Sequence, residues 1–380
     1  MSSFKRVKAA LIGCGVISRT YFKNLTTKFH VIELIGCADI IPEKARLCAD
    51  EFGLKAMTVE EIYNDPSIEI VINTTFPLAH YNVTKAALLA GKNVYTEKMM
   101  AVEYSLGEEL VKLSNDKGLL FTTAPDTFLG GGWQTVRNII DIGWIGKPVG
   151  VNAICIRSYE DYGSVYSKTK HFVFGYGSGI PFDMGGYYMH AMINLLGPIS
   201  RVTGFAQIRE PIRKYTNPRH PKFGETFELD STNSMTATLE FKNGTLANLL
   251  ITSASFGFEK PVFEIYGTEG ALILFDPNDF SGEIKLRRNT MSEYNIISSI
   301  FPYNDDNRGI GVADMAYALL ENRKPRVDAS LGLHALEAMH GVVGCAKDNL
   351  THIMKTTVER PEPLPLIHAD GETYENILRS

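Results

Sequence analysis

Residues 8–18 read Lys-Ala-Ala-Leu-Ile-Gly-Cys-Gly-Val-Ile-Ser, an apolar run followed by two closely spaced glycines and the start of a helical pattern. Gly13 permits a tight turn, and Gly15 lets the backbone approach a phosphate group without a Cβ in the way. Val16 and Ile17 open the next helix, where exposed backbone N–H groups form the positive end of a dipole. The stretch predicts a strand, a turn and a helix that bind the pyrophosphate of a dinucleotide.

A carboxylate further along the chain supports this reading. Ser18 stands where the dinucleotide fingerprint has a third Gly or Ala, so the glycine turn alone is equally consistent with an ordinary strand-to-helix turn. A second apolar run, 31–38, ends in Asp39, about 20 residues on, where a carboxylate meets the adenosine ribose. Because a carboxylate repels a 2′-phosphate and no arginine follows at once, we expect NAD rather than NADP.

Composition limits the class of protein. A chain of 380 residues with 44% hydrophobic content is long enough for two domains. Its net charge of −5 argues against a nucleic-acid partner and favours small molecules. The five cysteines include no Cys-x-x-Cys pair, so neither a disulfide framework nor a metal site is predicted. The chain lacks an apolar run of about 18 residues, and we expect a cytoplasmic protein with no membrane span.

Up to residue 125, strand-like and helix-like segments alternate. Glycine and proline punctuation predicts helices over 42–52, 79–89 and 104–117 and strands over 69–73, 93–96 and 119–122. This alternation is typical of a parallel sheet with crossover helices. Residues 1–125 are therefore predicted to form an α/β Rossmann domain with a doubly wound sheet.

The pattern changes after residue 125. Runs 236–241 and 245–251 flank an Asn-Gly turn and predict a hairpin, and further strands follow over 262–266, 271–275 and 283–286. Helices are expected over 311–321 and 331–349. Residues 126–380 are thus predicted to form an α+β domain with a large, mostly antiparallel open sheet. One free face of that sheet would suit a homo-oligomer contact, in a dimer or tetramer.

Ligands of open parallel sheets bind beyond the carboxyl ends of the strands. A lysine at such an end, Lys98, can hydrogen-bond the oxygen of a carbinol and stabilise the alkoxide that develops as hydride leaves. The alternative is a solvated surface lysine. We expect the cofactor to contact Gly13, Gly15, Val16, Ile17, Asp39, Thr74, Thr75, Phe76, His80, Glu97, Lys98 and Asp126.

A second group of ionisable residues lies at Asp183, Tyr187 and His190, which share one face of a helix. A carboxylate, a phenol and an imidazole in one stripe suit proton transfer to or from a hydroxyl. A capped helix with core aromatics explains the same residues equally well. The preceding segment offers stacking faces and hydroxyls for a sugar ring, from Tyr159, Tyr162, Tyr166 and His171.

These elements together resemble the glucose-fructose oxidoreductase, inositol dehydrogenase and MocA family over nearly the whole chain. The resemblance rests on the glycine turn with Asp39, the Thr75 to His80 spacing, the string Ala-Gly-Lys-Asn-Val-Tyr-Thr-Glu-Lys over 90–98, and Asp183. It implies a two-domain oxidoreductase that uses NAD or NADP on sugars and polyols. The family's catalytic lysine corresponds to Lys98.

The family's Asp-x-x-x-His motif corresponds to Asp183 with tyrosine at 187, as in some members, and His190 is a second candidate for the acid/base. Two family prolines are replaced, by Phe76 and Met99. The strand end where inositol dehydrogenases carry an arginine pair reads Asp126-Thr127-Phe128, which leaves the substrate open.

We therefore expect hydride transfer between a nicotinamide and a secondary alcohol or carbonyl of a sugar, cyclitol or related polyol. Two alternatives remain open. One is a non-catalytic dinucleotide-binding regulator on the same fold. The other is a redox-neutral enzyme that keeps NAD tightly bound.

Overall fold

The computed structural model describes residues 5–157, 175–255 and 262–365. Within these residues the chain divides into two compact units. The first contains residues 5–130, 301–333 and 361–365, and the second contains residues 131–157, 175–255, 262–300 and 334–360. The sequence predicted a single division after residue 125, whereas both units are assembled from separate stretches of the chain.

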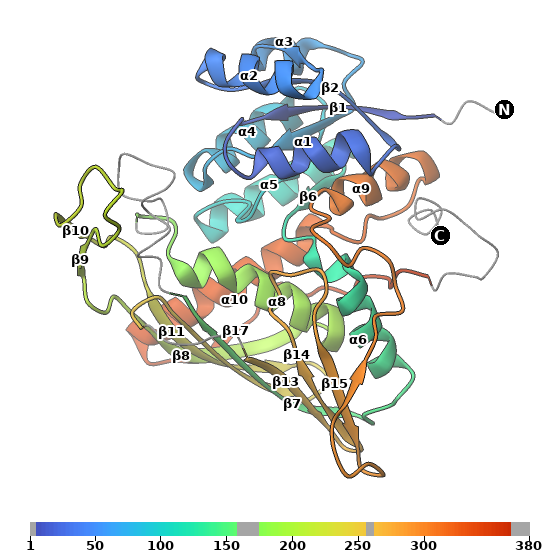
Figure 1. Ribbon diagram of the computed structural model, residues 1–380, viewed down its shortest axis with the longest axis vertical. Helices are drawn as coiled ribbons and strands as arrows, with labels where there is room; N and C mark the ends of the chain where they lie inside the picture. The colour runs from blue at the N-terminus through green and yellow to red at the C-terminus, as the bar shows by residue number, and fades with distance from the viewer. Residues whose placement is uncertain (1–4, 158–174, 256–261, 366–380) are drawn as a thin grey trace. The chain divides into compact units, whose positions relative to one another are not determined.

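The first unit is built on a six-stranded parallel sheet in the order β3-β2-β1-β4-β5-β6 (Figure 1). Its strands are β1 (Val7–Ile12), β2 (Ile32–Ala38), β3 (Lys55–Ala56), β4 (Ile70–Asn73), β5 (Asn93–Thr96) and β6 (Phe121–Thr123). The strand order reverses between β1 and β4, as in a doubly wound Rossmann sheet, so the predicted fold class is confirmed. In doubly wound sheets, ligands bind at such a reversal, beyond the carboxyl ends of the strands.

Helices connect the strands of this sheet. They are α1 (Ser18–Thr27), α2 (Pro42–Phe52), α3 (Val59–Asn64), α4 (Pro77–Leu89) and α5 (Tyr104–Lys117). Pro42 occupies the first turn of α2, and Gly53 ends the helix in the left-handed conformation, with φ of 68°. The sequence reading missed α3, although Thr58 and Glu61 form a capping box at its start.

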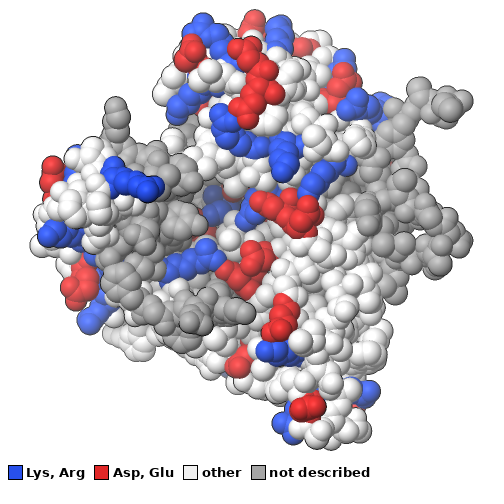
Figure 2. Space-filling view, viewed as in Figure 1, with Lys and Arg blue, Asp and Glu red and all other residues white. Residues whose placement is uncertain are grey.

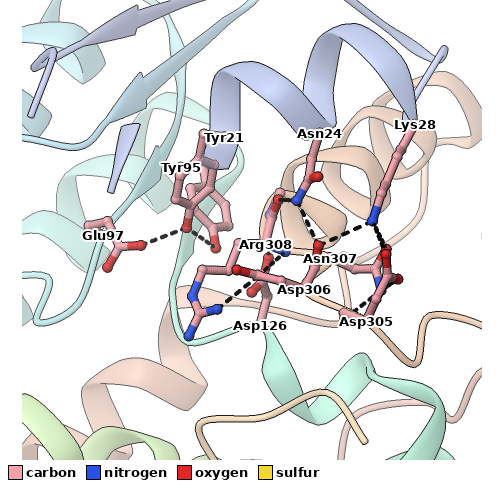
Figure 3. A network of polar contacts seen from close by, with 11 residues as sticks. Tyr21, Asn24, Lys28, Tyr95, Glu97, Asp126, Asp305, Asp306, Asn307 and Arg308 are labelled. Atoms are coloured by element: carbon pink, nitrogen blue, oxygen red, sulfur yellow. Dashed lines mark hydrogen bonds and ion pairs between the residues drawn. The ribbon is translucent and has the colours of Figure 1, made fainter. Parts of the chain in front are cut away.

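Residues 301–333 belong to the first unit because polar side chains of the Rossmann domain hold them. Asp126 Oδ2 accepts the backbone N–H groups of Gly309 and Gly311, both at 3.0 Å, at the start of α9 (Ile310–Glu321). Asn24 Nδ2 donates to the carbonyl oxygens of Asp306 and Arg308, at 3.1 and 2.9 Å (Figure 3). Each of these bonds joins residues more than 180 positions apart, a pairing that local sequence patterns do not reveal.

The second unit contains a nine-stranded sheet in the order β16-β15-β14-β13-β7-β12-β11-β8-β17. Its neighbouring strands pair antiparallel except for β7 and β12, which run parallel, so the predicted mostly antiparallel sheet is confirmed. Helices α6 (Gly131–Asp141), α8 (Ile180–Leu196) and α10 (Ala329–Asp348) lie over one face of it (Figure 1). The strands are β7 (Pro148–Ile156), β8 (Ile199–Gln207), β11 (Ser234–Phe241), β12 (Leu246–Thr252), β13 (Val262–Gly267), β14 (Gly270–Leu274), β15 (Ile284–Arg288), β16 (Asn295–Ile297) and β17 (His352–Ile353); β9 (Ile212–Lys214) and β10 (Thr226–Glu228) form a separate pair.

Basic and acidic side chains are intermixed on the face of the molecule that Figure 2 shows. None of the described helices combines the length and the apolar composition that a bilayer crossing requires.

A buried histidine fastens the edge of the nine-stranded sheet. His334 Nε2 accepts the backbone N–H of Ile199 at 3.0 Å, so the neutral ring carries its proton on Nδ1, which lies 2.7 Å from Thr356 Oγ1. Thr356 Oγ1 in turn donates to Glu337 Oε2. Burial lowers the pKa of His334 to about 4, Lys242 acts in the same direction, and Glu337 acts in the opposite one.

We expect this histidine to make the stability of the protein depend on pH. The unfolded chain binds the proton near pH 6.5 and the folded chain near pH 4, so stability is complete above pH 6.5 and decreases as the pH falls through that window, by up to roughly 3 kcal/mol. Urea titrations at pH 7.5, 5.5 and 4.5 measure the loss. His334→Gln should flatten this dependence, whereas the exposed control His30→Gln should not; an equal slope in all three proteins contradicts the assignment.

Candidate functional site

The glycine turn after β1 packs closely against the backbone of the turn after β4. Gly13 has φ of 104°, and a Cβ at this position would lie 2.7 Å from backbone atoms of Thr74 and Thr75, which follow β4. Thr74 binds the turn in return, donating its Oγ1 proton to the Gly13 carbonyl at 2.7 Å. Only glycine therefore fits at position 13, because both its dihedral angle and its packing exclude a side chain.

Gly15 shows the opposite situation. A Cβ at Gly15 would meet no protein atom within 4 Å, and the backbone is not in the left-handed region. Among the described residues, the backbone N–H groups of Gly15, Val16 and Ile17 have no protein acceptor. These donors open α1 beside empty space, which is the arrangement that a pyrophosphate requires.

Asp39 has a structural role that the sequence reading did not include. Its Oδ2 accepts the Cys14 N–H at 2.7 Å, and its Oδ1 accepts the Ile41 N–H at 2.8 Å. The carboxylate thus fixes the glycine turn against the end of β2. A carboxylate has about four lone-pair sites, so Asp39 retains acceptor capacity for ribose hydroxyls.

Large apolar side chains are exposed along the same edge of the sheet. Val16 after β1, Ile40 after β2 and Phe76 after β4 are 60%, 95% and 65% exposed. A flat aromatic ring bound at the edge would cover such side chains and recover hydrophobic free energy. Together with the absence of protein atoms around a Cβ at Gly15, these side chains are compatible with a dinucleotide at the carboxyl edge of the sheet.

Lys98 follows β5 at this edge and is partly buried, unlike a solvated surface lysine. Its neighbour Glu97 is buried and accepts the Tyr21 hydroxyl at 2.7 Å on Oε1 (Figure 3). The Lys98 N–H donates to Glu97 Oε2 at 3.1 Å. The carboxylate therefore holds the backbone from which the Lys98 side chain extends.

His80 lies in the first turn of α4 and is 1% exposed. Its Nδ1 lies 2.6 Å from the Met99 carbonyl oxygen, and its Nε2 lies 2.9 Å from the Thr75 carbonyl oxygen. The ring is thus engaged by the protein on both sides, and its expected contact with the cofactor remains a prediction.

Asn73, which the sequence reading missed, organises the same turn. Its Oδ1 accepts the N–H and the hydroxyl of Thr75, and its Nδ2 donates to the His80 carbonyl and to Thr84 Oγ1. An asparagine at the end of an otherwise apolar strand was the signal available in the sequence.

Asp126 is also expected at the cofactor, which stays a prediction, and the structure shows its side chain bonded to another part of the chain. Its side chain is buried and accepts the N–H groups of Gly309 and Gly311 at the start of α9. Burial raises the pKa of Asp126 to about 6, and these two backbone donors and Arg308 act in the opposite direction.

The second unit presents the three other ionisable residues on one helix. Gly179, with φ of 95°, precedes α8, and a Cβ there would lie 2.3 Å from the Thr232 carbonyl oxygen. Asp183, Tyr187 and His190 follow at helical spacing on one face of α8. Asp183 is partly exposed, whereas Tyr187 and His190 are buried. The four expected substrate contacts, Tyr159, Tyr162, Tyr166 and His171, lie outside the described residues.

The sequence matches a known family in both units. Residues 7–124 match an oxidoreductase family with an NAD-binding Rossmann fold, GFO/IDH/MocA, and residues 133–273 match the C-terminal domain of the same family. The chain belongs to the GFO/IDH/MocA oxidoreductase family. The resemblance read from the motifs is therefore confirmed.

Individual relatives match parts of the chain. An inositol 2-dehydrogenase/D-chiro-inositol 3-dehydrogenase of Lactiplantibacillus plantarum is 31% identical over 156 residues, which cover 37% of this chain and 42% of the relative. A scyllo-inositol 2-dehydrogenase (NADP(+)) of Bacillus subtilis is 29% identical over 145 residues, 38% of this chain and 39% of the relative. These matches thus span about two fifths of the relatives' own lengths.

A solved structure shows the same fold over nearly the whole chain. Levoglucosan dehydrogenase in complex with NADH and L-sorbose superposes with a TM-score of 0.81 at 18% identity, covering 93% of this chain and all of that one. At this identity the likeness establishes the fold.

The contrast between the two glycines gives a test of the crevice. Gly15→Ala places a methyl group in the open space and should leave the melting temperature unchanged while raising the Kd for NADH at least ~10-fold. Gly13→Ala should lower the melting temperature, because the methyl group meets the Thr74 and Thr75 backbone. Gly344→Ala, at another glycine with open space, serves as the control. Undiminished NADH binding by Gly15→Ala in calorimetry contradicts the site.

Proposed function

We propose that this protein is an NAD-dependent dehydrogenase or reductase acting on a secondary alcohol or ring carbonyl of a sugar, cyclitol or related polyol. The observation that carries the proposal is the position of Lys98 at the end of β5, where its side chain is partly buried and Glu97 holds its backbone. This strand belongs to a unit that matches the family's NAD-binding Rossmann fold and in which a Cβ at Gly15 would meet no protein atom. The names of the inositol and levoglucosan dehydrogenases support a polyol or sugar as the substrate.

The roles of the residues follow from where charge develops. The bound nicotinamide supplies hydride transfer, which no side chain can perform. In the direction of oxidation, the Lys98 ammonium hydrogen-bonds the substrate hydroxyl oxygen and stabilises negative charge as the C–H bond breaks. The hydroxyl proton passes to Tyr187 or His190, and Asp183 orients that acid/base. With the cofactor bound, the alcohol would become a carbonyl, its hydroxyl proton having passed to the acid/base residue.

Turnover by substituted proteins tests these roles once a panel of sugars and polyols has been screened by NADH absorbance. Lys98→Met should lower kcat at least ~100-fold with little change in NAD affinity, because only a transition-state interaction is removed. Tyr187→Phe should do the same. His190→Asn separates the acid/base candidates: a small effect assigns the role to Tyr187, and an equal loss indicates a relay through both.

The exposed Lys112→Met on α5 is the matched control and should turn over normally. Near-normal turnover by Lys98→Met would remove Lys98 from the catalytic residues, whereas no turnover of any sugar or polyol by the unaltered protein, with NADH still bound, would support a dinucleotide-binding regulator. Bound NAD that survives gel filtration would support the redox-neutral alternative.

We also propose that NAD is preferred over NADP, because the Asp39 carboxylate stands at the end of β2 and would repel a 2′-phosphate. Calorimetry should show at least ~10-fold tighter binding of NADH than of NADPH. Asp39→Asn should narrow that ratio. It should also weaken both ligands, since an NH2 group, which is a donor, replaces one of the two oxygens that accept the Cys14 and Ile41 N–H groups. Asp50→Asn, an exposed residue on α2, changes the net charge equally and should preserve the ratio. Tighter binding of NADPH by the unaltered protein contradicts the proposal.

The open face of the nine-stranded sheet is where we propose that a second copy of the chain binds. Phe205 pairs with Thr236, and Leu246 pairs with Glu240 and Gly150, so these residues project from the face opposite the helices. Phe205 is 69% exposed, and Leu246 and Tyr266 are also exposed on this face. Light scattering should give the mass of a dimer or tetramer, and Phe205→Lys should reduce it. The mass of a single chain for the unaltered protein contradicts this contact.

A further inference from the structure

We propose that His80 is a positioning residue that locks the turn after β4 to the segment after β5, and so sets where Lys98 stands relative to the nicotinamide half of the cofactor. This inference rests on the proposed function. It assigns a role to a buried histidine that hydride and proton transfer leave unused.

The His80 ring lies between two carbonyl oxygens. His80 Nδ1 faces the Met99 oxygen at 2.6 Å, and Nε2 faces the Thr75 oxygen at 2.9 Å. Thr75 belongs to the turn that follows β4, and Met99 directly follows Lys98. One imidazole therefore bridges two loops that meet at the carboxyl edge of the sheet.

The number of hydrogen bonds that the ring donates depends on its protonation state. A neutral imidazole donates one hydrogen bond and an imidazolium donates two. The neutral His80 ring can therefore donate to one of the two carbonyl oxygens, and the protonated ring can donate to both. Burial lowers the pKa of His80, while the two carbonyl acceptors and Glu97 act in the opposite direction. The ring is enclosed by protein, so a replacement side chain without a hydrogen-bond donor leaves the carbonyl groups of Thr75 and Met99 without this partner.

Lys98 is anchored on its other side as well. The Tyr21 hydroxyl donates to Glu97 Oε1 (Figure 3). The Lys98 N–H donates to Glu97 Oε2. Burial raises the pKa of Tyr21 well above its ordinary value, so the hydroxyl keeps its proton and remains a donor. Tyr21 fixes the residue before Lys98, and His80 fixes the residue after it. The backbone of Lys98 therefore has little freedom.

Asn73 fixes the turn after β4 and also bonds to the backbone of His80. Asn73 Oδ1 accepts the N–H and the hydroxyl of Thr75, and Asn73 Nδ2 donates to the His80 carbonyl oxygen at 3.1 Å. A dinucleotide spans the sheet so that one mononucleotide half lies on each side of the β1–β4 reversal. Because β4 and β5 lie on the side away from Asp39, loss of His80 should disturb the nicotinamide half and spare the adenosine half.

Calorimetry with two ligands measures that selectivity without a substrate. His80→Leu should raise the Kd for NADH at least ~10-fold and leave the Kd for ADP-ribose within ~2-fold of the unaltered protein. His80→Gln keeps one amide donor and should recover part of the affinity. Tyr21→Phe should also weaken NADH selectively, and Tyr63→Phe, which removes a hydroxyl bonded to the Val83 carbonyl elsewhere in the unit, should change neither ligand.

The outcomes separate this inference from the proposed function. Equal weakening of NADH and ADP-ribose by both His80 variants would show a purely structural role, and unchanged NADH binding would also overturn the inference. If the polyol panel yields no turnover but the selective loss of NADH affinity is observed, the inference stands and the proposed reaction fails. With a substrate identified, His80→Gln should lower kcat at least ~10-fold with less than ~3-fold change in the substrate KM.

Discussion

The close approach of two backbone turns, after β1 and after β4, is the constraint on which the site depends. Gly13 lies so near Thr74 and Thr75 that no Cβ fits between them. The approach brings the donors at the start of α1 to the reversal of strand order, where a ligand can meet both halves of the sheet. The same approach leaves Gly15 facing open space two residues later.

Buried polar side chains keep the turns in place, and each bonds to backbone groups. Asp39 holds the glycine turn, Asn73 holds the turn after β4, and His80 joins that turn to the segment after Lys98. A loop that leaves a parallel sheet has no ladder to pair its N–H and C=O groups, so these side chains substitute for one. The arrangement leaves other backbone donors, at Gly15 to Ile17, available to a ligand.

The sequence predicted the parts of this design that depend on local patterns. The strand, turn and helix over 8–18, the acid at Asp39 and the alternation up to residue 125 follow from periodicity and glycine positions. It did not predict contacts that join distant segments. The return of 301–333 depends on Asp126 and Asn24, whose partners lie more than 180 residues away. Lys92, part of the string over 90–98, is buried and donates to the carbonyls of Asp65 and Ile68, contacts that its sequence position did not reveal.

This difference explains why residues chosen for chemistry can serve the fold. Position after a strand marked Asp39, His80 and Asp126 alike, because any side chain there is near the ligand edge. What separates them is burial together with the partners that each side chain has. Asp126 is buried against the start of α9, and His80 is buried between two carbonyl groups, whereas Asp39 is partly exposed beside the exposed Ile40. A strand-end position therefore predicts proximity to the cofactor, and burial and hydrogen-bond partners, which only the structure gives, show which of these side chains the protein already encloses.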